Sequence, residues 1–107
     1  IPFTGFLYAG LMIGADGRAR VIEFNARMGD PETQVILLRL ASDFSVVLEA
    51  AIDGRLAGME LDWAPGSALG VVMAAAAYPG TPRLGDVIDG LDRAPDGSAK
   101  VFHAGTR

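Results

Sequence analysis

Five side chains that could bind a metal ion or a charged substrate lie within the ten residues EFNARMGDPE, at positions 23–32. The rest of the chain offers little such chemistry, because 50% of its residues are hydrophobic and only 21% are charged. Carboxylate and amide oxygens suit Mg²⁺ or Mn²⁺ and suit zinc or copper poorly. This stretch is therefore the first candidate site, and its candidate residues are Glu23, Asn25, Arg27, Asp30 and Glu32.

Glu23 and Asn25 are two positions apart in the predicted strand 19–25, so their side chains point to the same face. Two protein oxygens are enough for magnesium if water and a phosphate complete its coordination. The plainer interpretation is a solvated sheet face with no ligand. Because the pattern Glu-x-Asn is common by chance, spacing alone favours that plainer interpretation.

Arg27, Asp30 and Glu32 each have a structural alternative as well. The planar guanidinium of Arg27 suits a phosphate, an acyl phosphate or a carboxylate, but an ion pair with Asp30 or Glu32 is an equal alternative. Asp30 precedes Pro31 and is expected first to cap a helix, which is compatible with contacting an amine substrate. Glu32 is the weakest candidate, because the helix dipole favours an acid in the first turn of any helix.

A β-hairpin is expected to position the two predicted metal ligands. Segments 6–13 and 19–25 read as strands, and the Asp16-Gly17 pair between them is typical of a two-residue type I′ turn. Pairing outward from this turn sets Arg20 across from Ile13, Glu23 across from Gly10, and Asn25 across from Tyr8. Gly10 in this register either leaves room for a ligand above Glu23 or marks a β-bulge.

Two helices are expected to follow the loop ARMG. The first, ETQVILLRLA at 32–41, starts at the Asp30-Pro31 pair. The second, FSVVLEAAID at 44–53, can be capped by Ser42 or Asp43 and is closed by Gly54.

A domain boundary is expected where periodicity is lost, between about residues 55 and 67, because this segment contains Pro65 and Gly66. Strands are expected beyond it, at 68–78, briefly within 78–88, and at 100–106. The predicted class is α+β, with a hairpin and two helices before a β-rich part. The predicted domains are 1–57 and 66–107, joined by a connection at 58–65.

Composition excludes several classes of protein. The net charge of −4 gives no basic surface for nucleic acid. The absence of cysteine rules out disulfides and thiolate chemistry, and it fits a cytoplasmic location. The longest apolar run, LGVVMAAAAYP, is too short to span a bilayer, so no membrane partner is expected. Nothing in the composition indicates an oligomeric state.

A resemblance to a known family changes the weight of these observations. The segments GFLYAGLM, VIEFNARMGDPETQ, ALGVVMAAAAYPG, GDVI and KVFHAGT occur in this order. Together they resemble the glycinamide ribonucleotide synthetase family of the ATP-grasp superfamily, over nearly the whole chain. The segment NARMGDPETQ is close to a signature of that family.

The resemblance implies an ATP-dependent ligase of purine biosynthesis that joins glycine to 5-phosphoribosylamine. In such ligases the glycine carboxylate attacks the γ-phosphate of ATP to give an acyl phosphate. The amine of phosphoribosylamine then displaces phosphate, so the products are glycinamide ribonucleotide, ADP and phosphate. Magnesium or manganese would offset the charge that develops on the phosphate oxygens.

Site residues carry over by position. Glu23 and Asn25 match the metal ligands of the family, on the strand before the signature loop. Arg27 matches an arginine that related enzymes direct at an anionic substrate or intermediate. Asp30 belongs to the GDPE signature, near the glycine or ribosylamine site, and is taken with Arg27 as catalytic.

The chain departs from the family pattern in two places. The strand FLYAGLMI holds no second acid, so Glu23 is the one carboxylate ligand visible in the sequence. Ala76 and Ala77 stand where family members commonly have glycines before a Tyr-Pro pair. The second change argues against a close backbone approach at that point.

The resemblance also implies that the chain is a C-terminal fragment: the end of an ATP-grasp domain and the start of a β-rich C-terminal domain. A lone two-stranded hairpin is marginally stable, so its sheet neighbours are expected in sequence outside this chain. The 107 residues alone are accordingly expected not to catalyse ligation. Two alternatives stay open, namely a free-standing non-catalytic module that binds a metal or a partner, and an ATP-grasp ligase for another acid or amine.

Overall fold

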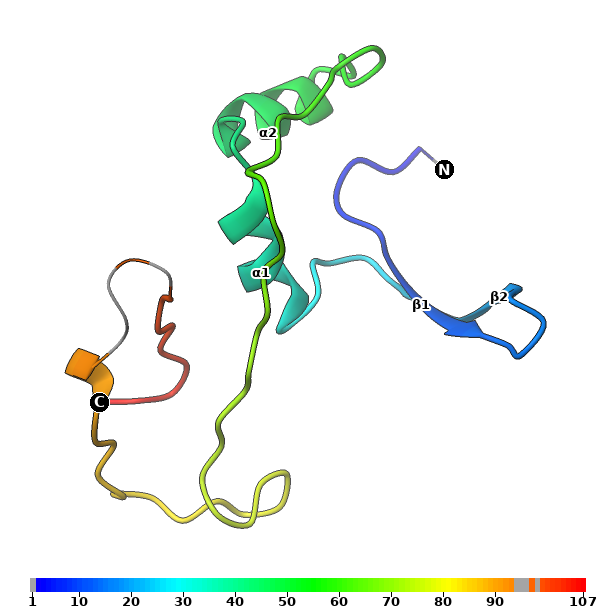
Figure 1. The fold of residues 1–107 in the computed structure, drawn as a ribbon. Coiled ribbons are helices and arrows are strands. Elements are labelled where there is room, and N and C mark those ends of the chain that lie inside the picture. Colours follow the sequence, from blue (N-terminus) through cyan, green and yellow to red (C-terminus); the bar gives the residue numbers. More distant parts are fainter. Residues whose placement is uncertain (1, 94–96, 98) are drawn as a thin grey trace. The chain divides into compact units, whose positions relative to one another are not determined.

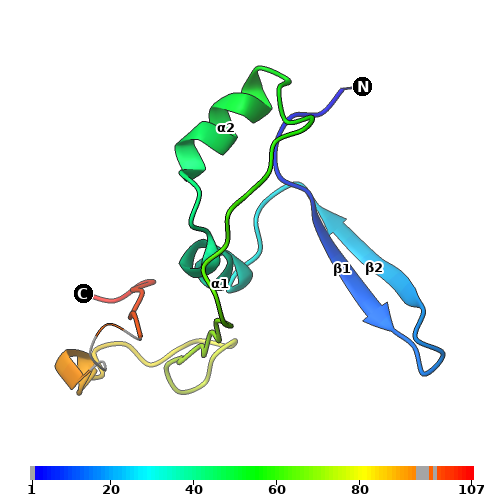
Figure 2. The same ribbon diagram turned by 45° about the horizontal axis from the view of Figure 1, so that its top comes forward.

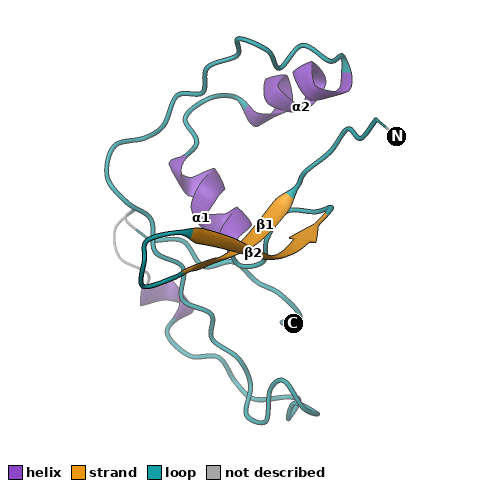
Figure 3. Ribbon diagram, turned by 90° about the vertical axis from the view of Figure 1, so that its right-hand side faces the viewer, coloured by secondary structure: helices purple, strands orange, loops and turns teal. Residues whose placement is uncertain are grey.

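The fold is an antiparallel hairpin followed by two helices, with little regular structure beyond them. A computed structural model describes residues 2–93, 97 and 99–107 (Figure 1). Its elements, coloured by type in Figure 3, are β1 Tyr8–Ile13, β2 Ala19–Asn25, α1 Glu32–Arg39, α2 Phe44–Ile52 and the 3₁₀ turn η1 Leu91–Arg93. Contacts divide the chain into two compact units, Ile1–Gly70 and Val71–Arg107.

The hairpin register agrees with the sequence prediction at one end and differs at the other. Tyr8 pairs with Asn25 and Gly10 pairs with Glu23, as predicted, in the antiparallel ladder that Figure 2 shows. Nearer the turn Ile13 pairs with Ala19, so the predicted pairing of Arg20 with Ile13 is wrong. The register shifts between Gly10 and Leu11, which leaves Ile22 as an extra residue in β2. The alternative that Gly10 marks a bulge is therefore confirmed.

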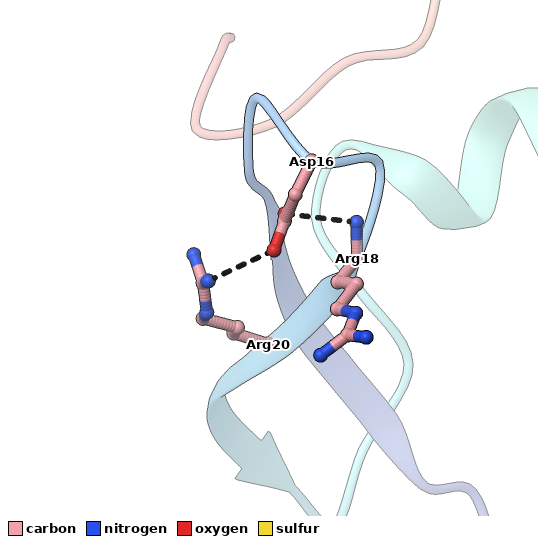
Figure 4. A network of polar contacts seen from close by, with 3 residues as sticks. All are labelled: Asp16, Arg18 and Arg20. Carbon is pink, nitrogen blue, oxygen red and sulfur yellow. Dashed lines mark hydrogen bonds and ion pairs between the residues drawn. The ribbon is translucent and has the colours of Figure 1, made fainter.

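The turn differs from the predicted two-residue type. The Gly17 N–H donates to the Gly14 carbonyl at 2.9 Å, and the Gly14 N–H donates to Arg18 at 3.0 Å, which encloses a three-residue loop. Gly17 has a φ of 72°, as a type I turn with a left-handed third residue requires. Asp16 holds this loop, since its carboxylate accepts from the Arg18 N–H at 3.1 Å and from Arg20 at 3.3 Å (Figure 4).

The first helix begins in a different way from the predicted Asp30 cap. The cap position of α1 is Pro31, and no side chain caps it. Gly29 closes the first turn instead, because its carbonyl accepts from both the N–H and the hydroxyl of Thr33. Asp30 is therefore not a helix cap, and its carboxylate accepts from the Gln34 amide at 3.2 Å.

The second helix confirms its predicted ends. The Asp43 carboxylate accepts from the Ser45 N–H at 2.8 Å and so caps α2. At the other end Gly54 has a φ of 68°, and its N–H donates to Ala51 while the Arg55 N–H donates to Ala50 at 2.7 Å. This pair of bonds is the Schellman motif, which a glycine in this position permits.

Residues 62–64 run alongside the junction of the two helices. Leu40 forms an antiparallel bridge with Trp63, and the Ala64 N–H donates to the Arg39 carbonyl at 2.7 Å. The side chain of Arg39 returns a bond to the Ala64 carbonyl at 2.9 Å. The segment after α2 is thus bound back onto the helices within the first unit.

The described residues of 68–107 contain no strand, although the sequence predicts strands at 68–78, briefly within 78–88, and at 100–106. Alanine is depleted in strands, and residues 74–77 are four alanines. The backbone turns there, with the Tyr78 N–H donating to Ala75 and the Gly80 N–H donating to Ala77. A strand also needs a hydrogen-bonded neighbour, and the described part of this segment supplies none. Residues 94–96 and 98 of the predicted second domain lie outside the described residues.

Few side chains of the described residues are withdrawn from water. Ala50 is the buried hydrophobic residue among them, at 3% exposed, whereas Ile22 and Phe24 of β2 are 63% and 61% exposed. The apolar faces of both hairpin strands are therefore open. No helix within the described part of the chain is long and apolar enough to cross a membrane.

Candidate functional site

Glu23 and Asn25 lie on one face of β2, as predicted. Their cross-strand partners Gly10 and Tyr8 are also two residues apart, which places both side chains on the same side of the hairpin. The Asn25 amide donates to the Glu23 carboxylate at 3.0 Å. Val21 lies on the other side, because the bulge at Ile22 pairs it with Leu11.

Gly10 makes room for the Glu23 side chain itself. A Cβ atom at Gly10 would lie 3.1 Å from Cγ of Glu23, which is tighter than ordinary van der Waals contact. The stem of Glu23 therefore passes over Gly10, and its carboxylate extends past this point to Asn25. The space above Gly10 positions the acid and does not form a separate ligand cavity.

The donor set of this face fits a hard cation. Glu23 supplies carboxylate oxygens, and rotating the Asn25 amide by 180° would present its oxygen in place of its nitrogen. No group of three or more His, Cys, Asp or Glu side chains that could hold a metal occurs within the described residues. The two side chains thus suit an ion that takes most of its ligands from water and phosphate, as Mg²⁺ does.

Arg27 is exposed and lies in the loop of residues 26–31, which joins β2 to α1. Its guanidinium donates to the Met28 carbonyl at 2.9 Å, so the loop itself holds the side chain. The ion pairs found among the described residues are Arg20–Asp16, Arg55–Asp53 and Arg83–Asp86. The alternative role for Arg27, an ion pair with Asp30 or Glu32, is therefore not adopted.

Glu32 has a specific partner that the sequence did not indicate. The Tyr8 hydroxyl donates to Oε1 of Glu32 at 3.2 Å, across 24 positions of sequence. This hydrogen bond is the largest cause that raises the pKa of Tyr8 above 10.0, and the negative charge of Glu32 is the second largest. Burial and the Glu23 charge act in the same direction, and Arg27 acts in the opposite one. The contact that the structure shows at the Tyr8 hydroxyl is the one with Glu32.

Tyr8 and Gly29 are the two neighbours of the site that sequence reasoning missed. The signal for Tyr8 was present, because the predicted register already set it across from Asn25. Gly29 is buried, and the contact that requires a glycine there is with a side chain three residues later. No pattern of spacing predicts such a contact.

A small apolar hollow lies beside the loop. Its volume is about 130 Å³, and its lining residues are Phe6, Leu7, Tyr8, Arg27, Met28, Gly29 and Ile36. A larger hollow of about 400 Å³ contains none of the predicted site residues, and it is lined by Val35, Ile36, Arg39, Trp63, Ser67 and Ala68. The polar face of β2 and the small hollow therefore define the candidate site.

The chain is similar to a known protein family and to several individual proteins. Residues 1–33, which contain the hairpin and the loop, match the family described as "Phosphoribosylglycinamide synthetase, ATP-grasp (A) domain". The chain is 64% identical over 106 residues to the phosphoribosylamine–glycine ligase of Xanthomonas axonopodis pv. citri (strain 306), covering 99% of this chain and 24% of that protein.

Two further relatives carry the same name. The phosphoribosylamine–glycine ligase of Ralstonia nicotianae is 62% identical over 99% of this chain and 25% of its own length. That of Allochromatium vinosum is 59% identical over 100% of this chain and 25% of its own length. The chain is therefore homologous to a segment of phosphoribosylamine–glycine ligases, and it spans about a quarter of the length of these relatives.

Proposed function

We propose that the chain supplies one wall of the active site of a phosphoribosylamine–glycine ligase. The observation that carries this proposal is the 64% identity across 99% of the chain. The geometry adds physical support, because Glu23 and Asn25 share a face and the loop with Arg27 and Asp30 starts directly after Asn25.

The proposed reaction joins glycine to 5-phosphoribosylamine at the expense of ATP. The glycine carboxylate attacks the γ-phosphorus of ATP, so that ADP leaves and a glycyl phosphate forms. The amine of phosphoribosylamine then attacks the acyl carbon, loses a proton, and expels phosphate to leave glycinamide ribonucleotide. Bound Mg²⁺ or Mn²⁺ offsets the charge on the phosphate oxygens during these transfers.

Each candidate residue has a proposed task in this scheme. Glu23 and Asn25 bind the metal through oxygen. Arg27, whose guanidinium is held at one edge by Met28, directs its planar fork at an anionic substrate or at the acyl phosphate. Asp30 is not a helix cap, and Gln34 donates to its Oδ1, so the exposed carboxylate would contact an amine through Oδ2.

The finer domain organisation is part of the same proposal. Residues 1–57 would form the end of an ATP-grasp domain, and residues 66–107 would begin a β-rich C-terminal domain after the connection at 58–65. The match of residues 1–33 to the ATP-grasp (A) domain supports the first assignment. The open apolar faces of β1 and β2 fit a hairpin that other elements of a larger domain cover.

The metal assignment can be tested in a segment-swapped ligase. In this protein the matching 106 residues of the Xanthomonas axonopodis ligase are replaced by those of the present chain. We expect Glu23→Gln to lower ligation by about a hundredfold or more and to raise the Mg²⁺ concentration needed, because a carboxylate ligand is lost. The measurement is glycine-dependent ADP release over a range of Mg²⁺ concentrations.

A matched control is Glu60→Gln, which removes one negative charge at an exposed position in the connection. It should leave both the rate and the Mg²⁺ requirement unchanged. If Glu23→Gln behaves like this control, the metal assignment is wrong. If the unsubstituted swapped protein folds but is inactive, this result contradicts the ligase proposal and supports the alternative of a non-catalytic module.

A further inference from the structure

Tyr8 connects the strand that carries the predicted metal ligands to the helix that follows the loop. Its backbone pairs with Asn25 in the hairpin ladder. Its hydroxyl donates to Glu32, in the first turn of α1, at 3.2 Å. Residues 26–31 leave the sheet beside Tyr8 and enter the helix beside Glu32, so one side chain holds both ends of this loop.

The side chain of Glu32 packs against Gly29, which lies within the same loop. A Cβ atom at Gly29 would lie 2.9 Å from Cδ of Glu32 and 3.0 Å from its Cβ, and it would overlap Oε2. The carboxylate can therefore reach Tyr8 only because Gly29 has no side chain. The Gly29 carbonyl is bound at the same time by Thr33, which fixes this part of the loop to α1.

The residues that depend on this arrangement are those that would touch substrate. Arg27 and Asp30 both lie between the two ends of the loop, and both are exposed. Arg27 is bound only to the neighbouring Met28 carbonyl, and Asp30 only to the Gln34 amide, among the contacts of the described residues. Neither side chain is fixed to the sheet, so the position of the loop decides where both lie.

We propose that Tyr8, Glu32 and Gly29 form a clasp that positions the loop of residues 26–31, and with it Arg27 and Asp30, relative to the Glu23–Asn25 face. Tyr8 and Glu32 are positioning residues in this account, and they do not touch the reacting atoms. The consequence for catalysis rests on the proposed ligase function. The clasp itself is a property of the chain and can be judged separately.

Activity measurements in the segment-swapped ligase test the positioning role. We expect Tyr8→Phe and Glu32→Ala each to raise the KM for glycine or for 5-phosphoribosylamine by about tenfold, because a small displacement of a substrate-orienting group has effects of at least this size. The double variant should be no worse than either single one, since both remove the same hydrogen bond. Partial unfolding would lower kcat without changing KM.

Conservative variants separate the hydrogen bond from other effects. Glu32→Gln keeps an oxygen acceptor for Tyr8, so its KM should lie within about threefold of the unsubstituted value, as expected for a weaker neutral acceptor. Gly29→Ala should resemble Tyr8→Phe, because the added methyl group displaces Glu32. Tyr78→Phe and Glu49→Gln remove the same groups from exposed positions and should change nothing.

Hydrogen exchange in residues 24–34 decides the clasp without reference to turnover. We expect exchange to be faster in Tyr8→Phe and Glu32→Ala than in Tyr78→Phe, with the faster exchange confined to this segment. Unchanged exchange overturns the clasp, whether or not the swapped ligase is active. Faster exchange with unchanged KM values in an active enzyme overturns the positioning role. An inactive but folded swap refutes the proposed function, and the exchange result still decides the clasp.

Discussion

At the scale of the residue, the backbone of Ala77 is strained. Its φ is 73°, in the left-handed region, where a Cβ atom is crowded by the following carbonyl. Members of the resembling family commonly have glycine just before the Tyr-Pro pair, and glycine takes this conformation at no steric cost. Ala77 therefore has a backbone conformation that glycine would adopt with less strain.

We expect Ala77→Gly to stabilise the segment-swapped ligase, by about 1 kcal/mol in the free energy of unfolding. Ala76→Gly is the control, because the φ of Ala76 is not positive and the substitution there only adds freedom to the unfolded chain. The measurement is the denaturant midpoint of each variant. Equal shifts of the same sign at both positions would contradict the assignment of strain to Ala77.

At the scale of the element, local signals worked where one side chain decides the geometry. Ser42 or Asp43 was predicted to cap α2 and Gly54 to close it. The structure shows Asp43 as the cap and confirms Gly54, because a cap and a left-handed glycine act within a few residues. The hairpin was predicted correctly near Tyr8 and Gly10. It was wrong beyond the bulge, because Ile22 is added without any mark in the sequence. Asp30 resembled a helix cap in the sequence as much as Asp43 did. It does not cap α1, because the Thr33 N–H donates to the Gly29 carbonyl instead.

The cap of α2 leads to a prediction about pH. The Ser45 side chain, followed by its backbone N–H, holds the pKa of Asp43 below its ordinary value of 3.8. A depressed folded-state pKa means that the stabilisation is complete at neutral pH and is lost as pH falls through that pKa. We expect Asp43→Asn, which keeps a capping oxygen, to lack this loss, and Asp43→Ala to be less stable throughout.

This effect is measured by the denaturant midpoints of the swapped ligase. They are taken between neutral pH and about pH 3, which lie on either side of the ordinary carboxyl pKa. The difference in stability between the unsubstituted protein and Asp43→Asn should decrease on acidification below pH 3.8. A difference that does not change with pH would contradict the role given to the Asp43 charge.

At the scale of the whole molecule, the described residues bury little apolar surface against one another. Ala50 is the buried hydrophobic residue of the described part, and the large apolar side chains of β1 and β2 remain in contact with water. The α+β order and the site face could be predicted, because they depend on alternation and on short loops. No strand forms among the described residues of the second unit, because strand formation depends on a paired neighbour, which local sequence does not specify.

The exposed apolar side chains of β1 and β2 fit the similarity of the chain to a segment of longer proteins. The chain spans 24% of the Xanthomonas axonopodis ligase and is 64% identical to it there. In the proposed enzyme, Glu23 and Asn25 would bind the metal, and Arg27 and Asp30 would contact substrate. None of these four residues is proposed to bind ATP. We therefore propose that the chain is a necessary but insufficient part of a ligase.

The most direct test of this claim is the rate of ADP formation, dependent on both glycine and 5-phosphoribosylamine, in the segment-swapped ligase and in the 107-residue chain alone. We predict that the swapped enzyme works within about tenfold of the Xanthomonas axonopodis ligase, a change of about 1.4 kcal/mol in the barrier, and that the chain alone gives no ADP. A folded swap without turnover, or ligation by the chain alone, would contradict the account.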